Sequence, residues 1–245
     1  MNEENKPTVS QSDINNIVWR ACDSFRGTVD AAAYKDYVLV LLFYKYLSDF
    51  FKDHKEAISR EFTDTDIIER RLRRARFKVP EGCSFDEIYN KRNEEQLGDI
   101  LNKAFTAIED ANIDKLDGVL RHLDFNDEKF GTTKECNKLF KDLLQDFSKI
   151  DLRPSRIGSE DIIGNCYLYL ISNFASDAGK IGGEFYTPNE VAKLLARLVK
   201  PQSGDRICDP TCGSGGLLIE AADLIADENC SLYGQEKNSG TFALC

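Results

Sequence analysis

The sequence has no apolar run long enough to cross a membrane. Its longest run, residues 37–44, is eight residues long, whereas a bilayer-spanning helix needs about 20. Residues 2–5 are polar and acidic, which predicts that no secretory signal is present. Together these absences predict a cytoplasmic protein with no membrane partner. A hydrophobic content of 42% beside 30% charged residues predicts a globular chain.

The cysteines follow no pattern that would indicate disulfides or zinc. All eight are scattered along 245 residues, whereas disulfide-rich domains are short and secreted. Cys208 and Cys212 are the nearest pair, but neither a second pair nor a histidine cluster accompanies them. We therefore expect reduced thiols and no metal site.

The sequence also lacks an excess of positive charge. It has 32 Lys and Arg against 42 Asp and Glu, for a formal net charge of −10. A protein that binds DNA by itself usually carries a basic stripe. Either this chain does not hold nucleic acid, or a partner supplies much of the electrostatic attraction.

One segment departs from this acidic average. Residues 70–78 read RRLRRARFK, which places six basic side chains in nine positions. Such a run is typical of a solvated helix face whose long stems cover apolar surface. It is also typical of a contact with phosphate groups or with an acidic partner. The sequence alone leaves both interpretations open.

Helical signals dominate residues 11–150, where no fixed-period repeat is present. Ser12 is a suitable N-cap for a first helix. The apolar residues after it have the spacing of one helical face: Ile14, Ile17, Val18 and Ala21. Further helices are expected over residues 31–51, 66–77, 94–112 and 133–147, with a loop at residues 79–82. These patterns predict an all-α N-terminal domain over residues 1–155.

The pattern changes after Pro154. A helix is expected over residues 161–176, followed by a glycine-containing loop at residues 179–183. The next helix has a predicted capping box, with Thr187 as N-cap, Pro188 at the first helical position and Glu190 three residues after the cap. Its predicted core face consists of Val191, Leu194, Leu195 and Leu198.

A strand, a glycine loop, a helix and a second strand then follow in order. The strands are expected at residues 206–208 and 231–234, and the helix at residues 217–226. This β–loop–α–β order predicts that residues 156–245 form the start of an α/β Rossmann-like domain. Its remaining strands are expected to lie beyond the sequence.

The loop from Asp209 to Gly216 is the strongest chemical signal. Glycines between a strand and a helix let a ligand approach the backbone closely. An acid at the end of the next strand, here Glu236, can bind both hydroxyls of a ribose. This combination predicts a nucleoside-containing ligand, against the alternative of a tight turn with no ligand.

The phosphate-binding versions of this loop do not fit. A dinucleotide loop needs a third glycine where this sequence has Leu218, and a P-loop needs a lysine, which is absent between Lys200 and Lys237. Asp209 at the strand end suits a cationic or amine-bearing ligand. S-adenosylmethionine has an ammonium, a sulfonium and a ribose but no phosphate, and it is therefore the expected cofactor.

Three segments carry a family resemblance. DPTCGSGGLLIEA (residues 209–221) resembles the cofactor motif of amino-group DNA methyltransferases, and GGEFYTPNEVAKLL (residues 182–195) resembles their second cofactor motif. Their order, the helical segment YKDYVLVLLFYKYLSDFF (residues 34–51) and YGQEKNSGTFALC (residues 233–245) together resemble the modification subunit of type I restriction–modification systems.

The resemblance implies roles for particular residues. The methionine half of the cofactor would be contacted by Gly183, Glu184, Phe185, Tyr186, Thr187 and Pro188. Asp209, Gly213, Ser214, Gly215 and Gly216 would surround its methionine and ribose. Glu236 would hold the ribose hydroxyls. As plain structural alternatives, Thr187 and Glu190 would only start a helix, and Asp209 and Glu236 would be ordinary turn acids.

The resemblance also implies an activity and partners. The parent protein would methylate the exocyclic amine of adenine in DNA, reaching DNA through a complex with a specificity subunit, a restriction subunit and a second modification subunit. The family's catalytic motif, Asn/Asp-Pro-Pro-Phe/Tyr, does not occur in this sequence. No catalytic residue is therefore assigned, and we expect these residues alone to be inactive. The alternatives are a different methyl acceptor (cytosine amine, RNA or protein) and a non-catalytic helical module that binds the specificity subunit.

Overall fold

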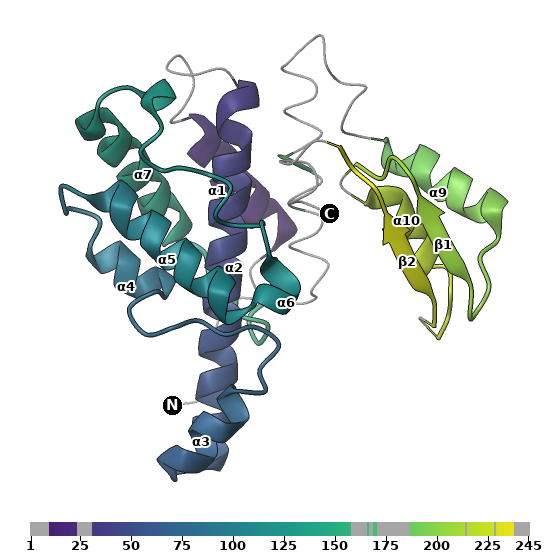
Figure 1. The fold of residues 1–245 in the computed structure, drawn as a ribbon, viewed down its shortest axis with the longest axis horizontal. Helices are drawn as coiled ribbons and strands as arrows, with labels where there is room; N and C mark the ends of the chain where they lie inside the picture. The colour runs from purple at the N-terminus through teal and green to yellow at the C-terminus, as the bar shows by residue number, and fades with distance from the viewer. Residues whose placement is uncertain are drawn as a thin grey trace. The chain divides into compact units, whose positions relative to one another are not determined.

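The chain forms two compact units, Met1–Leu170 and Ile171–Cys245. The computed structural model in Figure 1 describes residues 10–23, 31–157, 166, 169–170, 187–213, 215–227 and 229–237. The predicted helix at residues 161–176 lies mostly outside this part, although residues 166, 169 and 170 are helical. The domain boundary between residues 155 and 156 stays a prediction.

The regular elements that the structure describes in unit 1 are all helices, joined by loops and turns (Figure 1). Its elements are α1 (Gln11–Asp23), α2 (Ala31–Glu61), α3 (Thr65–Leu72), α4 (Phe85–Asn90), α5 (Leu97–Ala111), α6 (Ile113–Leu116), the 3-10 helix η2 (Glu128–Phe130) and α7 (Thr133–Phe147). The predicted all-α domain is confirmed, and α7 has the predicted bounds. No described helix is long and apolar enough to span a membrane.

The N-terminal half of α2 is the centre of unit 1. Tyr37 packs edge-to-face on Phe125 and Phe130, with ring centroids 5.3 and 4.7 Å apart. Its hydroxyl donates to the carbonyl of Asp124 at 2.9 Å, so the buried polar atom is satisfied. Burial raises the pKa of the Tyr44 hydroxyl well above its usual range. The heavy Tyr, Phe and Leu content of residues 31–51 thus corresponds to burial on most sides.

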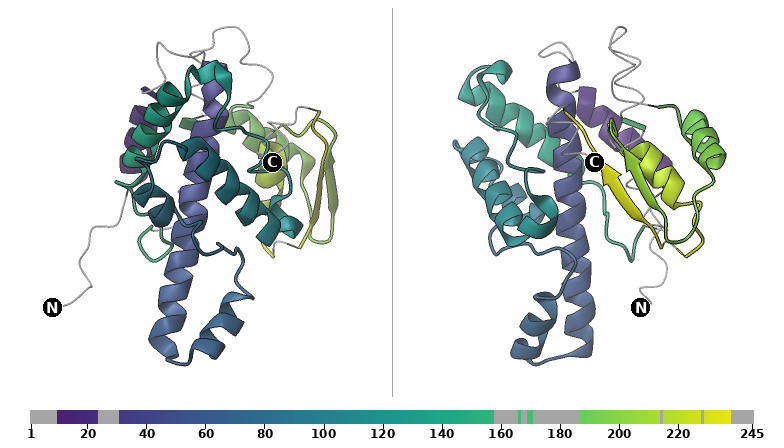
Figure 2. Two further views of the ribbon diagram at one scale, coloured as in Figure 1. Left: turned by 60° about the vertical axis from the view of Figure 1, so that its left-hand side comes forward. Right: turned by 45° about the vertical axis from the view of Figure 1, so that its right-hand side comes forward.

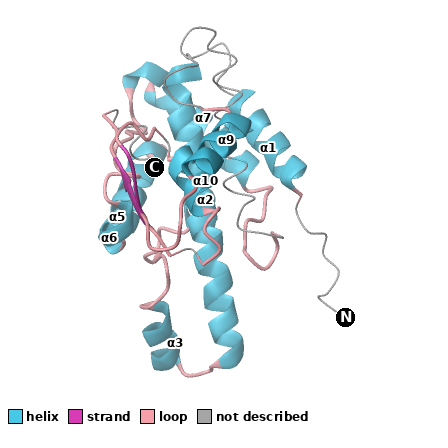
Figure 3. Cartoon of the chain, turned by 90° about the vertical axis from the view of Figure 1, so that its right-hand side faces the viewer, coloured by secondary structure: helices cyan, strands magenta, loops and turns pink. Residues whose placement is uncertain are grey.

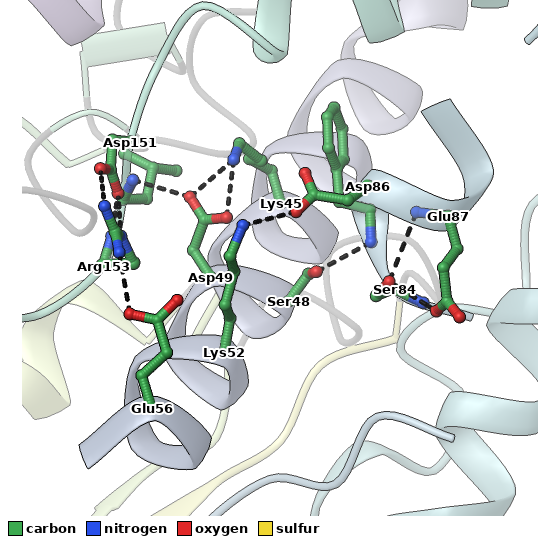
Figure 4. Close-up of polar contacts among 12 residues, drawn as sticks. Lys45, Ser48, Asp49, Lys52, Glu56, Ser84, Asp86, Glu87, Asp151 and Arg153 are labelled. Carbon is green, nitrogen blue, oxygen red and sulfur yellow. Dashed lines mark hydrogen bonds and ion pairs between the residues drawn. The ribbon is translucent and has the colours of Figure 1, made fainter. Parts of the chain in front are cut away.

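Three acidic side chains on α2 hold the segment that follows α7, and Figure 4 shows two of them, Asp49 and Glu56. Asp49 accepts from the Leu152 amide at 2.8 Å and pairs with Lys45 at 2.6 Å. One turn further along, Asp53 accepts from the Ser155 amide at 2.8 Å, and Glu56 lies 3.2 Å from Arg153. The last described stretch of unit 1 before residue 158 is therefore fixed along one face of α2.

Several helix boundaries in unit 1 differ from the expectation. The first helix begins at Gln11, and Ser10 caps it by accepting from the Asp13 amide, so the prediction of Ser12 as N-cap is wrong. The predicted helix at 66–77 ends at Leu72. Helix α4 was not predicted, although its capping box of Ser84 and Glu87 is readable in the sequence. At these sites tertiary contacts and caps decide the boundary, rather than apolar spacing.

Unit 2 contains α9 (Asn189–Val199), β1 (Arg206–Asp209), α10 (Gly216–Ala222) and β2 (Ser231–Gly234). The two strands are parallel, with Arg206 opposite Ser231 and Asp209 opposite Gly234. Figure 2 shows α9 and α10 beside this strand pair, and Figure 3 shows the strands next to each other. The predicted β–loop–α–β unit is confirmed.

The start of α9 corrects a prediction. Pro188 is the N-cap, with an extended ψ of 138°, and no side chain caps the helix. The carbonyl of Pro188 accepts the first helical bonds from Val191 and Ala192. Because the helix begins one residue later than expected, Glu190 is no longer three residues after the cap, and the capping box predicted for Thr187 and Glu190 does not form.

The apolar face of α9 also differs from the expectation. Val191, Leu194 and Leu198 are 44, 57 and 67% exposed, whereas Ala192 and Ala196 on the neighbouring face are 4% exposed. The small alanines allow α9 to pack closely within unit 2. The predicted core face is thus not covered by any described part of this unit.

Candidate cofactor-binding site

The candidate site lies where the two parallel strands end. Asp209, the last residue of β1, is in register with Gly234, the last residue of β2. The carboxyl ends of parallel strands meet at one edge of a sheet, where α/β proteins bind their ligands. The loop after β1 and the residues after β2 are therefore adjacent.

Backbone bonds join these two segments. The Gln235 amide donates to the Asp209 carbonyl, and the Cys212 amide donates to the Gln235 carbonyl, both at 3.0 Å. The Asp209 carboxylate accepts from the Thr211 amide at 2.9 Å, which turns the chain sharply as it leaves β1. The turn-acid role considered for Asp209 is thus present, and it uses one of the two carboxylate oxygens.

Glu236 is brought to the glycine loop. Its Oε2 accepts from the Gly213 amide at 3.1 Å, although the two residues are 23 positions apart in the chain. The side chain is half-buried rather than fully exposed. The structure therefore places the acid expected to bind ribose directly against the loop expected to surround the cofactor.

The loop needs glycine for its backbone and leaves space beside it. Gly213 and Gly215 have φ of +57° and +81°, a region that other residues rarely adopt. Gly216 starts α10 with an ordinary helical conformation, and a Cβ added there, or at Gly213, would meet no atom within 4 Å. This open space beside the backbone fits the close approach of a ligand.

One contact that shapes the site was not expected from the motifs. A Cβ at Gly234 would lie 2.7 Å from Cys212 Sγ and 3.2 Å from Cys212 Cβ, so any larger residue at position 234 would force the buried Cys212 side chain to shift. A glycine as the last residue of a short strand is the available sequence signal for such a close approach. Cys212 acts here as a packing residue between the loop and β2.

Some predicted site residues lie outside the described part of the chain: Gly183, Glu184, Phe185, Tyr186 and Ser214. Thr187 and Pro188 are described, and both are exposed just before α9. Within the described residues no cluster of three His, Cys, Asp or Glu side chains could hold a metal ion. The cysteines that the structure describes are all free thiols.

A helical unit followed by a parallel β–α–β unit, with a glycine loop that contacts a strand-end acid, places the chain in the class of proteins with a Rossmann-like nucleoside-binding fold. Residues 14–147 match the family model described as the HsdM N-terminal domain, and residues 158–245 match the model described as N-6 DNA methylase. The first match covers more than half of the sequence, and the chain belongs to the HsdM N-terminal domain family. Its resemblance to type I modification subunits is thereby confirmed.

Relatives and solved structures agree with this assignment. The chain is 30% identical to the type I restriction enzyme MpnII methylase subunit of Mycoplasma pneumoniae, over 99% of this chain and 50% of the relative. It is 32% identical to the MjaVIII methylase subunit of Methanocaldococcus jannaschii, over 96% and 40%. A type I methyltransferase subunit from Streptococcus thermophilus superposes with a TM-score of 0.78 at 26% identity, over 96% of this chain and 54% of the other. The chain spans about half the length of these proteins or less.

Proposed function

We propose that this chain is the helical domain and the cofactor-binding part of a DNA methyltransferase, the modification subunit of a type I restriction–modification system. The proposed reaction is methyl transfer from S-adenosylmethionine to the N6 amine of adenine. The observation that carries the proposal is the bond between the Gly213 amide and the Glu236 carboxylate. The match of residues 158–245 to an N-6 DNA methylase model supports the reaction.

The described residues have properties that suit this cofactor. Glu236 can accept hydrogen bonds from two ribose hydroxyls while Gly213 keeps its carboxylate in place. Asp209 places a negative charge at the end of β1, and Gly216 leaves room beside the backbone. When bound, S-adenosylmethionine supplies the methyl group on its sulfonium. The segment from Gly183 to Pro188 is proposed to hold its methionine half, as the resemblance implies.

The proposed setting is a cytoplasmic complex. DNA would be reached together with a specificity subunit, a restriction subunit and a second modification subunit, which accounts for an acidic chain in a DNA-modifying enzyme. We expect no methyl transfer by these 245 residues alone, because they contain no Asn/Asp-Pro-Pro-aromatic motif. Incorporation of labelled methyl groups into adenine by the purified chain would contradict this.

Calorimetry with S-adenosylmethionine tests the cofactor site. Glu236→Gln should weaken binding about 10- to 100-fold, because a hydrogen bond to a charged group contributes about 1.5–3 kcal/mol. Gly216→Val should block binding by filling the open space, while leaving φ unstrained at this helical position. Asp223→Asn, at the far end of α10, is the matched control and should bind normally.

Two results would overturn the cofactor proposal. One is tight binding of ATP or NAD without binding of S-adenosylmethionine. The other is wild-type affinity for S-adenosylmethionine in both site variants. If the chain bound the specificity subunit but no cofactor, the non-catalytic assembly module would become the better interpretation.

A further inference from the structure

The basic segment, residues 70–78, lies where the helical unit projects outward. Helix α3 packs beside the C-terminal end of α2, beyond α4, α5 and α7 (Figures 1 and 2). No residue of α3 is buried, and Ile58 is the only buried residue of α2 after position 50. The side chains of α3 are therefore not selected by packing in a core.

The helix dipole accounts for only part of the basic charge. Arg70 and Arg71 occupy the last turn of α3, where cations are favoured, and Asp64 caps the start of the helix. The other four basic residues of the segment come after the helix has ended at Leu72. A solvated helix face, one of the two interpretations left open by the sequence, therefore does not describe most of the segment.

The second half of the segment is anchored so that its basic side chains face solvent. Ala75, Phe77 and Val79 are 8, 9 and 8% exposed, while the intervening Arg74, Arg76 and Lys78 are exposed. The ring of Phe77 packs edge-to-face against the rings of Phe43 and Phe50 of α2. Alternate residues thus fix the backbone, and the residues between them present their charge outward.

Hydrogen bonds fix the same stretch from the other side. The buried side chain of Asn112 accepts from the Lys78 amide at 2.8 Å and donates to the Lys78 carbonyl at 2.7 Å. Lys115 donates to the carbonyl of Arg76 at 3.0 Å and adds another exposed cation beside the segment. Because the backbone is already ordered, little backbone conformational entropy would be lost when an anion binds.

The charge of Arg73 is only weakly engaged within the chain. The ion pair of Arg73 with Glu69 is 3.8 Å long, and both side chains are more than two-thirds exposed. Such surface pairs contribute about 0–1 kcal/mol. Protein interfaces usually have an apolar centre, whereas every exposed side chain of the basic segment is charged. Five of the six cations are arginine, whose planar guanidinium suits phosphate.

We infer that the basic segment, residues 70–78, is a docking surface for the phosphate backbone of duplex DNA. The segment belongs to unit 1, whereas the candidate cofactor site belongs to unit 2. The segment contacts DNA without reading its sequence, since phosphate contacts position the duplex rather than specify its sequence. The inference deepens the proposed function, in which DNA is the substrate, but it does not require cofactor binding.

The test compares two variants of the full chain that have the same net charge. The first changes four exposed cations of the segment to glutamine: Arg70, Arg73, Arg74 and Lys78. The control changes four exposed lysines elsewhere in unit 1 to glutamine: Lys91, Lys103, Lys134 and Lys138. Fluorescence anisotropy with a labelled duplex of arbitrary sequence, over a range of KCl concentrations, gives the affinity and its salt dependence. Circular dichroism checks that both variants fold.

The segment variant should lose most of its DNA affinity at low salt, and the control should keep it. The slope of log affinity against log salt should become shallower by roughly 0.9 for each phosphate that the variant no longer neutralises, or by up to roughly 3.6 for four. Equal behaviour of the two variants, or no binding by the wild-type chain, would overturn the inference. The inference would also be overturned if the segment variant bound DNA as the wild type does but bound a specificity subunit more weakly. Calorimetry with S-adenosylmethionine on the same proteins tests the proposed methyltransferase function independently, so that a failure of DNA docking can be distinguished from a failure of cofactor binding.

Discussion

At the scale of single residues, Glu109 shows how a buried charge is stabilised in unit 1. Its side chain is fully buried, yet it accepts from the amides of Gly118, Leu120 and Arg121 and contacts the Arg121 guanidinium. Burial alone would raise the pKa of Glu109, but these donors together lower it below its usual value. One carboxylate therefore organises the turn after α6.

We predict that Glu109→Gln lowers the free energy of unfolding by about 2–3 kcal/mol, because the hydrogen bonds to a buried charged group are removed. The lowered pKa also sets a sign for the pH dependence. The stabilisation is complete above the ordinary glutamate pKa of about 4.3 and is lost as the pH falls through the lower folded value. Urea unfolding at neutral and acidic pH should therefore show a smaller acid-induced loss in the variant.

Asp110→Asn is the matched control for this experiment. Asp110 is adjacent and also contacts Arg121, but its side chain is 61% exposed. An exposed pair adds little to stability, so this variant should unfold like the wild type and keep its acid sensitivity. If both variants lost equal stability, the buried carboxylate would not be the organising group.

At the scale of helices, two adjacent threonines at the start of α7 allow the contribution of the N-cap to be distinguished from the effect of replacing a threonine by alanine inside the helix. Thr132 is the N-cap of α7 and accepts from the Glu135 amide, while Glu135 accepts from the Thr132 amide. Thr133 is the first helical residue. We predict that Thr132→Ala lowers the free energy of unfolding by about 1 kcal/mol, whereas Thr133→Ala has little effect. Chemical denaturation of the two variants checks this, and a larger loss in Thr133→Ala would contradict it.

The elements with strong local signals were predictable from sequence. Helix α7 begins after a threonine cap and follows a clear apolar period, and its predicted bounds match the structure.

Helix α9 shows that apolar periodicity can predict the wrong buried face. Its large residues, such as Leu194 and Leu198, trace one face, but the helix packs through Ala192 and Ala196. Apolar spacing identifies a surface to be covered, and it does not identify which face packs within a particular unit.

The candidate cofactor site also contains one contact that the sequence predicts and one that it does not. The order of strand, glycine loop, helix, strand and acid predicts that Gly213 and Glu236 lie near each other, and the structure brings them within hydrogen-bonding distance. The contact between Gly234 and Cys212 was not predicted, because it depends on the register of two strands that only the fold defines. The local motifs therefore predicted which residues form the candidate cofactor site, whereas the packing around them depends on the strand register and could not be predicted.

At the scale of the whole molecule, the two units differ in how much core they contain. In unit 1, residues from distant segments meet around α2, and many aromatic side chains there are fully buried. The described part of unit 2 has a two-stranded sheet whose second strand is exposed at every residue. Two strands alone are marginally stable. The exposed apolar residues of α9 add to this difference, because side chains left in water contribute no burial energy.

We predict that unit 2 unfolds at a lower urea concentration than unit 1. Trp19 is the single tryptophan and belongs to unit 1, where its ring lies edge-on to Tyr169 with centroids 6.3 Å apart. Tryptophan fluorescence therefore reports on unit 1, whereas far-ultraviolet circular dichroism reports on both units. The circular dichroism signal should begin to fall before the fluorescence changes, and amides of β1 and β2 should exchange hydrogen faster than those of α2 and α7. Coincident transitions with equal exchange protection would instead mean that the two units unfold as one cooperative body.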